Sequence, residues 1–309
     1  MNKILITGGN GLVGSAIKNI VKSDSNNEYI FLGRKDGDLK IESDVENIFN
    51  KYKPTYVVHL AANVGGLFKN LDNNLSMFQD NLKMNQNVLK YAHKYKVNKL
   101  VACLSTCVFP DNTTYPINEK MLHNGAPHPS NEGYSYAKRL LEIECRLYNN
   151  KYGTNFSCII PTNVYGPNDN FSLKDGHVIP ALIHKAYLAE KNNDDLVVYG
   201  TGKPLRQFIY SEDLAKLILW ALFNYNENSP IILSPKSVYS IKETAEIISK
   251  NFNNIKIKYD KNKSDGQFKK DADNNKLINL YPEFKFISLE EGLKKTIKWF
   301  INNYKESRK

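Results

Sequence analysis

Short apolar runs alternate with amphipathic segments along the first half of the chain. The apolar runs are rich in β-branched residues and predict buried strands, over residues 3–7, 28–32, 56–60, 99–104 and 156–160. The segments between them carry apolar side chains at helical spacing, over residues 15–21, 45–52, 75–93 and 136–151. Such alternation is typical of right-handed βαβ crossovers and of a parallel sheet covered on both faces. The pattern therefore predicts a doubly wound α/β fold of the Rossmann type.

The regular alternation of predicted strands and helices ends at about residue 161. A loop-rich stretch at residues 165–170 precedes predicted helices at residues 178–191, 241–250 and 289–304. We interpret this part as a smaller lobe beside the carboxyl ends of the strands, where open α/β sheets bind ligands. The predicted Rossmann domain comprises residues 1–165 and about 207–235, and the predicted substrate-binding lobe comprises residues of about 166–206 and 236–309.

Composition narrows the class of protein. The 309 residues are 41% hydrophobic, which is enough for a large core, and the chain carries a formal net charge of +10. Its lysines are scattered and form no basic block, so we expect no nucleic-acid partner. No stretch approaches the roughly 20 apolar residues of a membrane span. We therefore expect a cytoplasmic protein with no targeting segment and no membrane partner.

The four cysteines do not form the framework of a secreted disulfide protein in a chain of this length. Cys103 and Cys107 are spaced like two metal ligands, but no second pair of Cys or His follows at zinc-site spacing. We therefore expect reduced thiols and no metal.

A glycine-rich turn joins the first predicted strand to the first predicted helix. Its glycines fit both G-x-G-x-x-G and a wider G-x-x-G-x-x-G spacing. In this position glycines permit a tight reversal and a close backbone approach to a pyrophosphate, which then lies at the helix N-terminus. The turn predicts a dinucleotide site formed by Gly8, Gly9, Asn10, Gly11, Leu12, Val13 and Gly14.

The end of the second predicted strand indicates which dinucleotide is bound. An NAD site usually has an acidic residue there for the ribose 2′-hydroxyl, whereas this chain has Arg34 and Lys35. Cations suit a 2′-phosphate, so we predict NADP(H). Asp36 and Asp38 are near enough to keep NAD open, although Asp38 and Leu39 could equally contact the adenine.

Candidate chemistry begins with Tyr134 and Lys138, which are four residues apart and hence on one helical face. A fixed cation beside a phenol helps it share or release a proton, so Tyr134 could act as a general acid or base. This spacing is common by chance, but here it follows a dinucleotide turn; Tyr136 has no lysine at the matching offset. Ser105 follows a strand at the expected active-site edge, and Cys107 could supply a thiolate base there.

Several further motifs accompany these residues. They lie at residues 7–14, 59–67, 105–110, 161–167, 176–180, 200–210 and 263–267. Together with Tyr134 and Lys138 they resemble the GDP-4-keto-6-deoxy-D-mannose 3,5-epimerase-4-reductases of the extended short-chain dehydrogenase/reductase family. The resemblance spans nearly the whole chain.

The resemblance implies epimerisation at C3 and C5 and NADPH-dependent reduction at C4 of a GDP-linked 4-keto-6-deoxy-hexose. It implies that Cys107 abstracts the protons at C3 and C5 and that His177 returns protons on the opposite face. Tyr134 would then protonate the C4 oxygen, assisted by Lys138 and Ser105. Taken alone, His177 would be an ordinary loop or helix-cap histidine.

The resemblance also implies binding residues and a homodimer formed through the helices at residues 75–93 and 136–151. The further cofactor contacts would be Lys138, Ala61, Ala62, Pro161, Thr162, Asn163 and Val164. The substrate contacts would be Lys185, Tyr199, Arg206 and Asp265. Two positions depart from some bacterial relatives, because Asn10 stands where a basic residue can meet the 2′-phosphate and Tyr199 where tryptophan is frequent.

Other activities on the same fold are less well supported. A dehydratase would need an acidic pair after the serine or threonine at the strand end, and residues 105–107 lack it. A 4-epimerase would not need Cys107 and His177. Another nucleotide-sugar epimerase or reductase, or a non-catalytic NADP-binding module, stays open as an alternative.

Overall fold

The structure is a computed structural model that describes residues 1–265 and 267–309, including all side chains there except those of residues 67 and 68. Residue 266, inside the matched segment 263–267, lies outside the described residues. A six-stranded sheet has the order β10-β5-β4-β3-β1-β2, and every neighbouring pair is parallel. Its strands are Asn2–Thr7 (β1), Asn27–Phe31 (β2), Tyr56–His59 (β3), Lys99–Cys103 (β4), Phe156–Pro161 (β5) and Ile231–Leu233 (β10). The predicted doubly wound α/β fold is confirmed.

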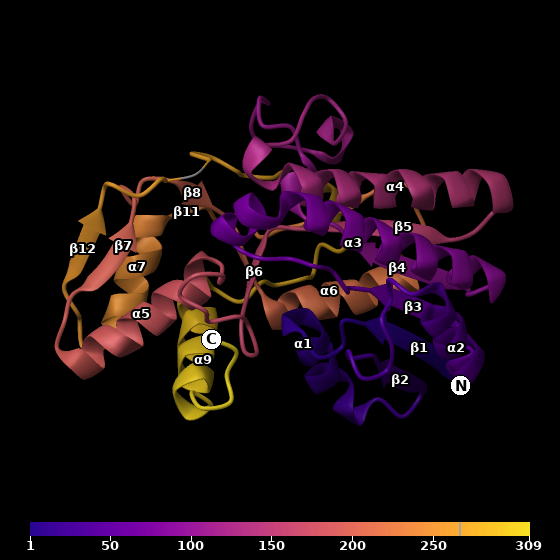
Figure 1. Cartoon of the computed structure of the whole chain (residues 1–309), viewed down its shortest axis with the longest axis horizontal. Coiled ribbons are helices and arrows are strands. Elements are labelled where there is room, and N and C mark those ends of the chain that lie inside the picture. Colours follow the sequence, from indigo (N-terminus) through magenta and orange to yellow (C-terminus); the bar gives the residue numbers. More distant parts are fainter. Residues whose placement is uncertain (266) are drawn as a thin grey trace.

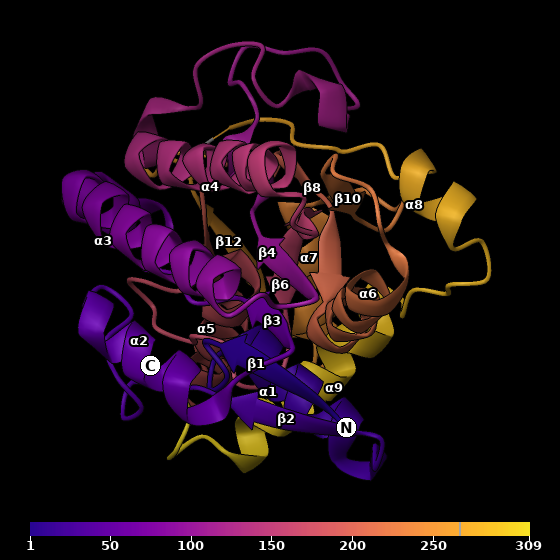
Figure 2. The ribbon, with the colours of Figure 1, turned by 90° about the vertical axis from the view of Figure 1, so that its right-hand side faces the viewer.

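Helices cover both faces of this sheet (Figure 2). On one face lie Glu42–Tyr52 (α2), Leu67–Lys94 (α3) and Glu132–Tyr152 (α4), and on the other lie Leu12–Ile20 (α1) and Ser211–Asn224 (α6). Successive strand residues enter opposite cores: Leu5 packs with the first helix group, whereas Ile4 and Ile6 pack with the second. This two-sided burial explains why the strands are continuous apolar runs.

A separate core forms the C-terminal lobe (Figure 1). Its elements include Val178–Asn192 (α5), Ile241–Lys250 (α7), Leu289–Asn302 (α9) and the paired strands Leu196–Tyr199 (β7) and Ile257–Asp260 (β12). Ser240 and Glu243 form a capping box that begins α7. Asn275–Leu280 (α8) instead packs on the sheet side, through Leu277. The domain boundaries at residues 165, 207 and 235 stay a prediction.

Short elements join the two parts. Asn163–Tyr165 (β6) pairs with Phe208–Tyr210 (β9), and Leu205–Arg206 (β8) pairs with Tyr239–Ser240 (β11). The 3₁₀ helices are Val21–Ser23, Thr106–Val108, Glu119–Met121 and Pro129–Asn131. Within the described parts of the chain, no helix combines the length and the apolar character that crossing a membrane requires.

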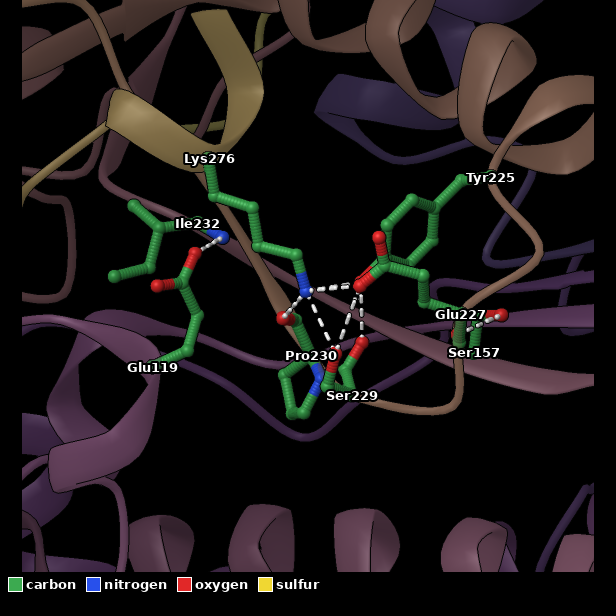
Figure 3. A network of polar contacts seen from close by, with 8 residues as sticks. All are labelled: Glu119, Ser157, Tyr225, Glu227, Ser229, Pro230, Ile232 and Lys276. Atoms are coloured by element: carbon green, nitrogen blue, oxygen red, sulfur yellow. Dashed lines mark hydrogen bonds and ion pairs between the residues drawn. The ribbon is translucent and has the colours of Figure 1, made fainter. Parts of the chain in front are cut away.

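A polar network closes the amino-terminal edge of the sheet, where the α6–β10 loop leads into β10 (Figure 3). Lys276 donates to the Tyr225 hydroxyl and to Ser229 Oγ, both at 2.6 Å, and forms an ion pair with Glu227 at 2.8 Å. Glu119 accepts a hydrogen bond from the backbone N–H of Ile232 at 2.9 Å. Because catalytic groups of such sheets gather at the carboxyl edge, this network is structural.

Candidate active site

The glycine turn between β1 and α1 has no room for larger residues. A Cβ on Gly14 would lie 2.6 Å from Gly8 O and from two backbone atoms of Gly9, and Gly8 itself has φ +68°. Gly11 N donates to Gly8 O at 2.9 Å, which closes the reversal. No side chain caps the N-terminus of α1, so its backbone N–H groups are free to face an anion. The turn fits a pyrophosphate.

The end of β2 presents positive charge. Arg34 and Lys35 are exposed, and neither forms an ion pair or hydrogen bond with any other residue that the structure describes. Asp36, which could have held a ribose hydroxyl, accepts a hydrogen bond from Gly33 N at 2.7 Å. Asp38 accepts from Lys40 N at 3.0 Å. With both acids engaged locally, the arrangement favours a 2′-phosphate over a free 2′-hydroxyl.

Two more backbone segments belong to the predicted dinucleotide site. Ala61 follows β3, and its N–H donates to Thr7 Oγ1 at 3.0 Å. After β5, Thr162 Oγ1 is buried and has no hydrogen-bond partner among the residues that the structure describes, although buried hydroxyls are nearly always satisfied. Asn163 Nδ2 donates to Gln207 O at 2.9 Å, which fixes the segment that also contains Pro161 and Val164. The orphan hydroxyl and the glycine cradle both fit a bound dinucleotide.

Tyr134 and Lys138 lie in the first turns of α4, as their spacing predicts. Lys138 is almost fully buried, donates to Cys103 O at 2.7 Å, and its Nζ lies 5.8 Å from the centre of the Tyr134 ring. Burial raises the pKa of Tyr134 well above its usual value and lowers the pKa of Lys138. For the Tyr134 hydroxyl, burial has the largest effect, and the acidifying effect expected of Lys138 stays a prediction. A protonated phenol suits a general acid.

Ser105 and Cys107 lie on the 3₁₀ turn that follows β4. Ser105 caps this turn, and its Oγ lies 3.5 Å from the backbone nitrogen of Cys107. Cys107, Tyr134 and Met77 form one small buried cluster bordered by Ala62, and Cys107 is close enough to Tyr134 to interact electrostatically with it. The structure thus brings the predicted thiol and the predicted phenol together at the carboxyl edge of the sheet.

His177 is the N-cap residue of α5, and it is exposed. Enough protein surrounds the ring for desolvation to lower the pKa of His177. Its loop is held against the segment after β3, because Gly66 N donates to Asp175 O at 3.0 Å. Among the described residues no hydrogen bond or ion pair joins His177 to Cys107 or Tyr134. Its acid role stays a prediction.

The predicted substrate residues cluster at the lobe. Lys185 Nζ lies 3.2 Å from the centre of the exposed Tyr199 ring, and burial lowers the pKa of Lys185 to about 8. The Asp265 carboxylate accepts from Thr201 N at 2.6 Å and from Thr201 Oγ1 at 2.7 Å. Asp265 therefore shapes the turn beside Tyr199, and its direct contact with a substrate stays a prediction.

Two cations connect this cluster with Cys107. Arg206 donates to Gln267 O at 2.6 Å and to its own neighbour Leu205 O at 2.7 Å. Lys270, which our sequence analysis did not select, is close enough to interact electrostatically with both Arg206 and Cys107. Neither cation has a carboxylate partner within ion-pair distance in the described chain. Unpaired neighbouring cations are suited to a diphosphate. The only sequence signal for Lys270 was its place just after the matched segment 263–267.

Fold and site together define a dinucleotide-dependent enzyme. Its candidate site combines a serine, a tyrosine and a lysine with the thiol of Cys107 and with the cations Arg206 and Lys270. Residues 4–234 match the family model for the NAD dependent epimerase/dehydratase family. The chain therefore belongs to this family.

Full-length relatives narrow the resemblance. The chain is 51% identical to "GDP-L-fucose synthase" of Dictyostelium discoideum, covering 99% of this chain and 97% of the relative. It is 46% identical to "Probable GDP-L-fucose synthase" of Drosophila melanogaster, covering 100% of both. The crystal structure of a GDP-L-fucose synthetase from Naegleria fowleri bound to NADP superposes with a TM-score of 0.95 at 47% identity, covering 100% of this chain and 95% of that one. These findings confirm the resemblance inferred from the motifs.

Proposed function

We propose that this protein converts GDP-4-keto-6-deoxy-D-mannose to GDP-L-fucose by epimerisation at C3 and C5 and reduction at C4. The observation that carries the proposal is the placement of Cys107 and Tyr134 in one small buried cluster beyond the end of β4. A reductase alone needs only the phenol, whereas epimerisation also needs a base beside it. The full-length similarity to enzymes named GDP-L-fucose synthase supports the same reaction.

NADP(H) fits the residues at the carboxyl edge of the sheet, and when bound it supplies the hydride for the reduction. The glycine turn and the N-terminus of α1 would hold its pyrophosphate, and Arg34 and Lys35 its 2′-phosphate. Thr162, with its unpaired buried hydroxyl, would contact the same ligand. The solved relative named above binds NADP.

In the epimerisation, Cys107 removes a proton from C3 or C5, both of which the C4 ketone acidifies. Negative charge then develops on the C4 oxygen, where Tyr134 and Ser105 donate hydrogen bonds. His177 returns a proton to the opposite face of the carbon, which inverts it. Because desolvation disfavours the phenolate, Tyr134 keeps its proton through these steps and gives it to the C4 oxygen during reduction.

The diphosphate of the substrate would bind to Arg206 and Lys270, since neither cation forms an ion pair within the described part of the chain. Tyr199 and Lys185 would then lie near the nucleoside. This placement puts the sugar beside Cys107, which Lys270 faces.

Product analysis tests the proposal. GDP-4-keto-6-deoxy-D-mannose incubated with the protein and NADPH should give GDP-L-fucose, with one NADPH oxidised per product, as followed by chromatography and NMR. A reduced sugar that keeps its original configuration at C3 and C5 would show a reductase without epimerase activity. No turnover at all would exclude the proposed substrate.

We further propose a cytoplasmic homodimer formed through α3 and α4. These helices pack together and expose apolar side chains, among them Leu75, Leu140 and Leu147. Leu75 is 70% exposed and Leu147 is 55% exposed, which suits a partner surface. Sedimentation should give twice the mass of the 35.3 kDa chain, and Leu75→Lys with Leu147→Lys should give the monomer. A monomeric wild-type protein would contradict this assembly.

A further inference from the structure

Arg139, next to Lys138 on α4, is a buried cation without an acidic partner. Only 6% of the residue's surface is exposed, and no Asp or Glu in the described chain lies within ion-pair distance of the guanidinium. Nε donates to Val108 O at 2.5 Å, Nη1 donates to Gly125 O at 2.7 Å, and Nη2 is buried with no partner. The guanidinium carbon also lies 5.5 Å from the centre of the Tyr136 ring. Burying a guanidinium that has no carboxylate partner is nevertheless costly, so its place in the fold calls for an explanation.

The contacts of Arg139 lead directly to Cys107. Val108 follows Cys107 in the chain and ends the 3₁₀ turn Thr106–Val108 that carries it. The turn is otherwise closed by Val108 N donating to Ser105 O at 3.1 Å and Phe109 N donating to Thr106 O at 3.3 Å. Arg139 therefore anchors the Cys107 turn to the same helix that carries Tyr134 and Lys138.

Charge around Cys107 comes from two sides. From α4 it faces Tyr134, Lys138 and Arg139, and from residues 267–273 it faces Lys270, beyond which lies Asp111. Lys138 is engaged with Cys103 O, and we have assigned Lys270 to the substrate diphosphate. Arg139, which like Lys138 donates to backbone carbonyls, is thus a second positive charge near the thiol, and we assign it to no substrate group.

We propose that Arg139 is a positioning residue for Cys107: it fixes the turn that aims the thiol, and its buried charge stabilises the thiolate that removes protons. The role of Cys107 as the base rests on the proposed function. An alternative is that Arg139 merely anchors residues 109–131 through Gly125. A purely structural anchor would leave the ionisation of Cys107 unchanged.

Two replacements separate the charge from the geometry. Arg139→Gln removes the charge and keeps a hydrogen-bond donor for Val108 O. Arg139→Lys keeps the charge but cannot donate to Val108 O and Gly125 O in the same geometry. Arg146→Gln is the matched control, because Arg146 lies on the same helix, pairs with Glu142 at 3.3 Å and is half exposed. Thermal unfolding and NADPH binding would verify that each variant is folded.

The first measurement is alkylation of Cys107 by iodoacetamide against pH, read out on the Cys107 peptide by mass spectrometry. It requires no substrate, so its outcome does not depend on the proposed reaction. We expect Arg139→Gln to slow alkylation at neutral pH about tenfold, because the turn is then held less firmly and the thiolate loses a neighbouring positive charge. Arg139→Lys and Arg146→Gln should keep the wild-type rate.

The second measurement is solvent-deuterium incorporation at C3 and C5 of the substrate. Arg139→Lys should slow it several-fold while NADPH binding is unchanged, because the thiol is then aimed less well. A wild-type alkylation profile for Arg139→Gln, or undiminished incorporation for Arg139→Lys, would overturn the proposal. If wild type itself incorporates no deuterium, the proposed function fails while the alkylation result still decides the charge effect.

Discussion

Tyr134 and Cys107 lie in the same buried cluster, yet at the scale of single residues we expect their replacement to interrupt different steps. Tyr134→Phe keeps the ring in the cluster with Cys107 and Met77 but loses the acidic hydroxyl. NADPH oxidation should therefore fall by roughly 10²- to 10⁴-fold, the range for loss of a general acid, while NADPH still binds. Stopped-flow absorbance and a cofactor titration measure the two quantities. Robust NADPH oxidation by this variant would remove Tyr134 from the acid role.

Cys107→Ser should instead interrupt the epimerisation. A serine hydroxyl is a far weaker base than a thiolate, so exchange of solvent deuterium into C3 and C5 should be lost. NMR of the recovered substrate, in the absence of NADPH, measures this step alone. Undiminished exchange would show that another group is the base.

Residues with a motif around them could be found from the sequence, and residues defined by tertiary neighbours could not. The spacing of Tyr134 and Lys138 gained meaning from the glycine turn that precedes it. No local sequence pattern marks Lys270 or Arg139. Lys270 draws attention only because it lies near Arg206 in the fold, and Arg139 only because it is buried with no carboxylate near it in the described chain. Only a folded chain shows which charges are unpaired.

At the scale of elements, the β1–α1 turn should be intolerant of even one methyl group. Gly14→Ala places a Cβ 2.6 Å from backbone atoms of Gly8 and Gly9, which must then shift and change the shape of the proposed pyrophosphate site. We expect NADPH affinity to fall at least about tenfold and stability to drop by about 1–3 kcal/mol, as for overpacking elsewhere. Gly125→Ala is the control, since its Cβ would meet nothing nearer than 3.4 Å. Equal NADPH affinity in both variants would contradict the proposal that the β1–α1 turn binds the pyrophosphate.

Elements buried on both faces by helices were predictable, and short elements were not. The five predicted strands lie within two residues of β1 to β5, since long apolar runs have few alternatives. β10 spans only Ile231–Leu233 and β8 only Leu205–Arg206, too short for any periodicity. Helix α6 is apolar over most of its circumference because it packs both on the sheet and against the neighbouring helix α1, which hid its amphipathic pattern.

At the scale of the whole molecule, the C-terminal end is fastened to the loop that follows β6. Phe171 N donates to Arg308 O at 2.8 Å, and Arg308 Nη2 donates to Asn168 O at 2.5 Å. Between these contacts lies Asp169, which is buried with one carboxylate oxygen unpaired. The C-terminal segment therefore covers Asp169. The sequence does not reveal this burial, because the contact between Arg308 and Asn168 joins residues 140 positions apart.

Burial raises the pKa of Asp169 from 3.8 to about 7, against the opposing effects of the Asn170 N–H and Arg308. From pH 4 to pH 7 the unfolded chain releases this proton while the folded chain keeps it, so folding stability falls as pH rises. Asp169→Asn cannot ionise and should escape this loss. The free energy of unfolding of the variant, relative to wild type, should therefore rise between pH 4 and pH 8, by up to about 4 kcal/mol for a shift of this size. Urea unfolding at both pH values measures the difference, with Asp72→Asn on the exposed face of α3 as the control. A difference that is the same at both pH values would mean that Asp169 is ionised in the folded chain, and that Arg308 compensates its charge.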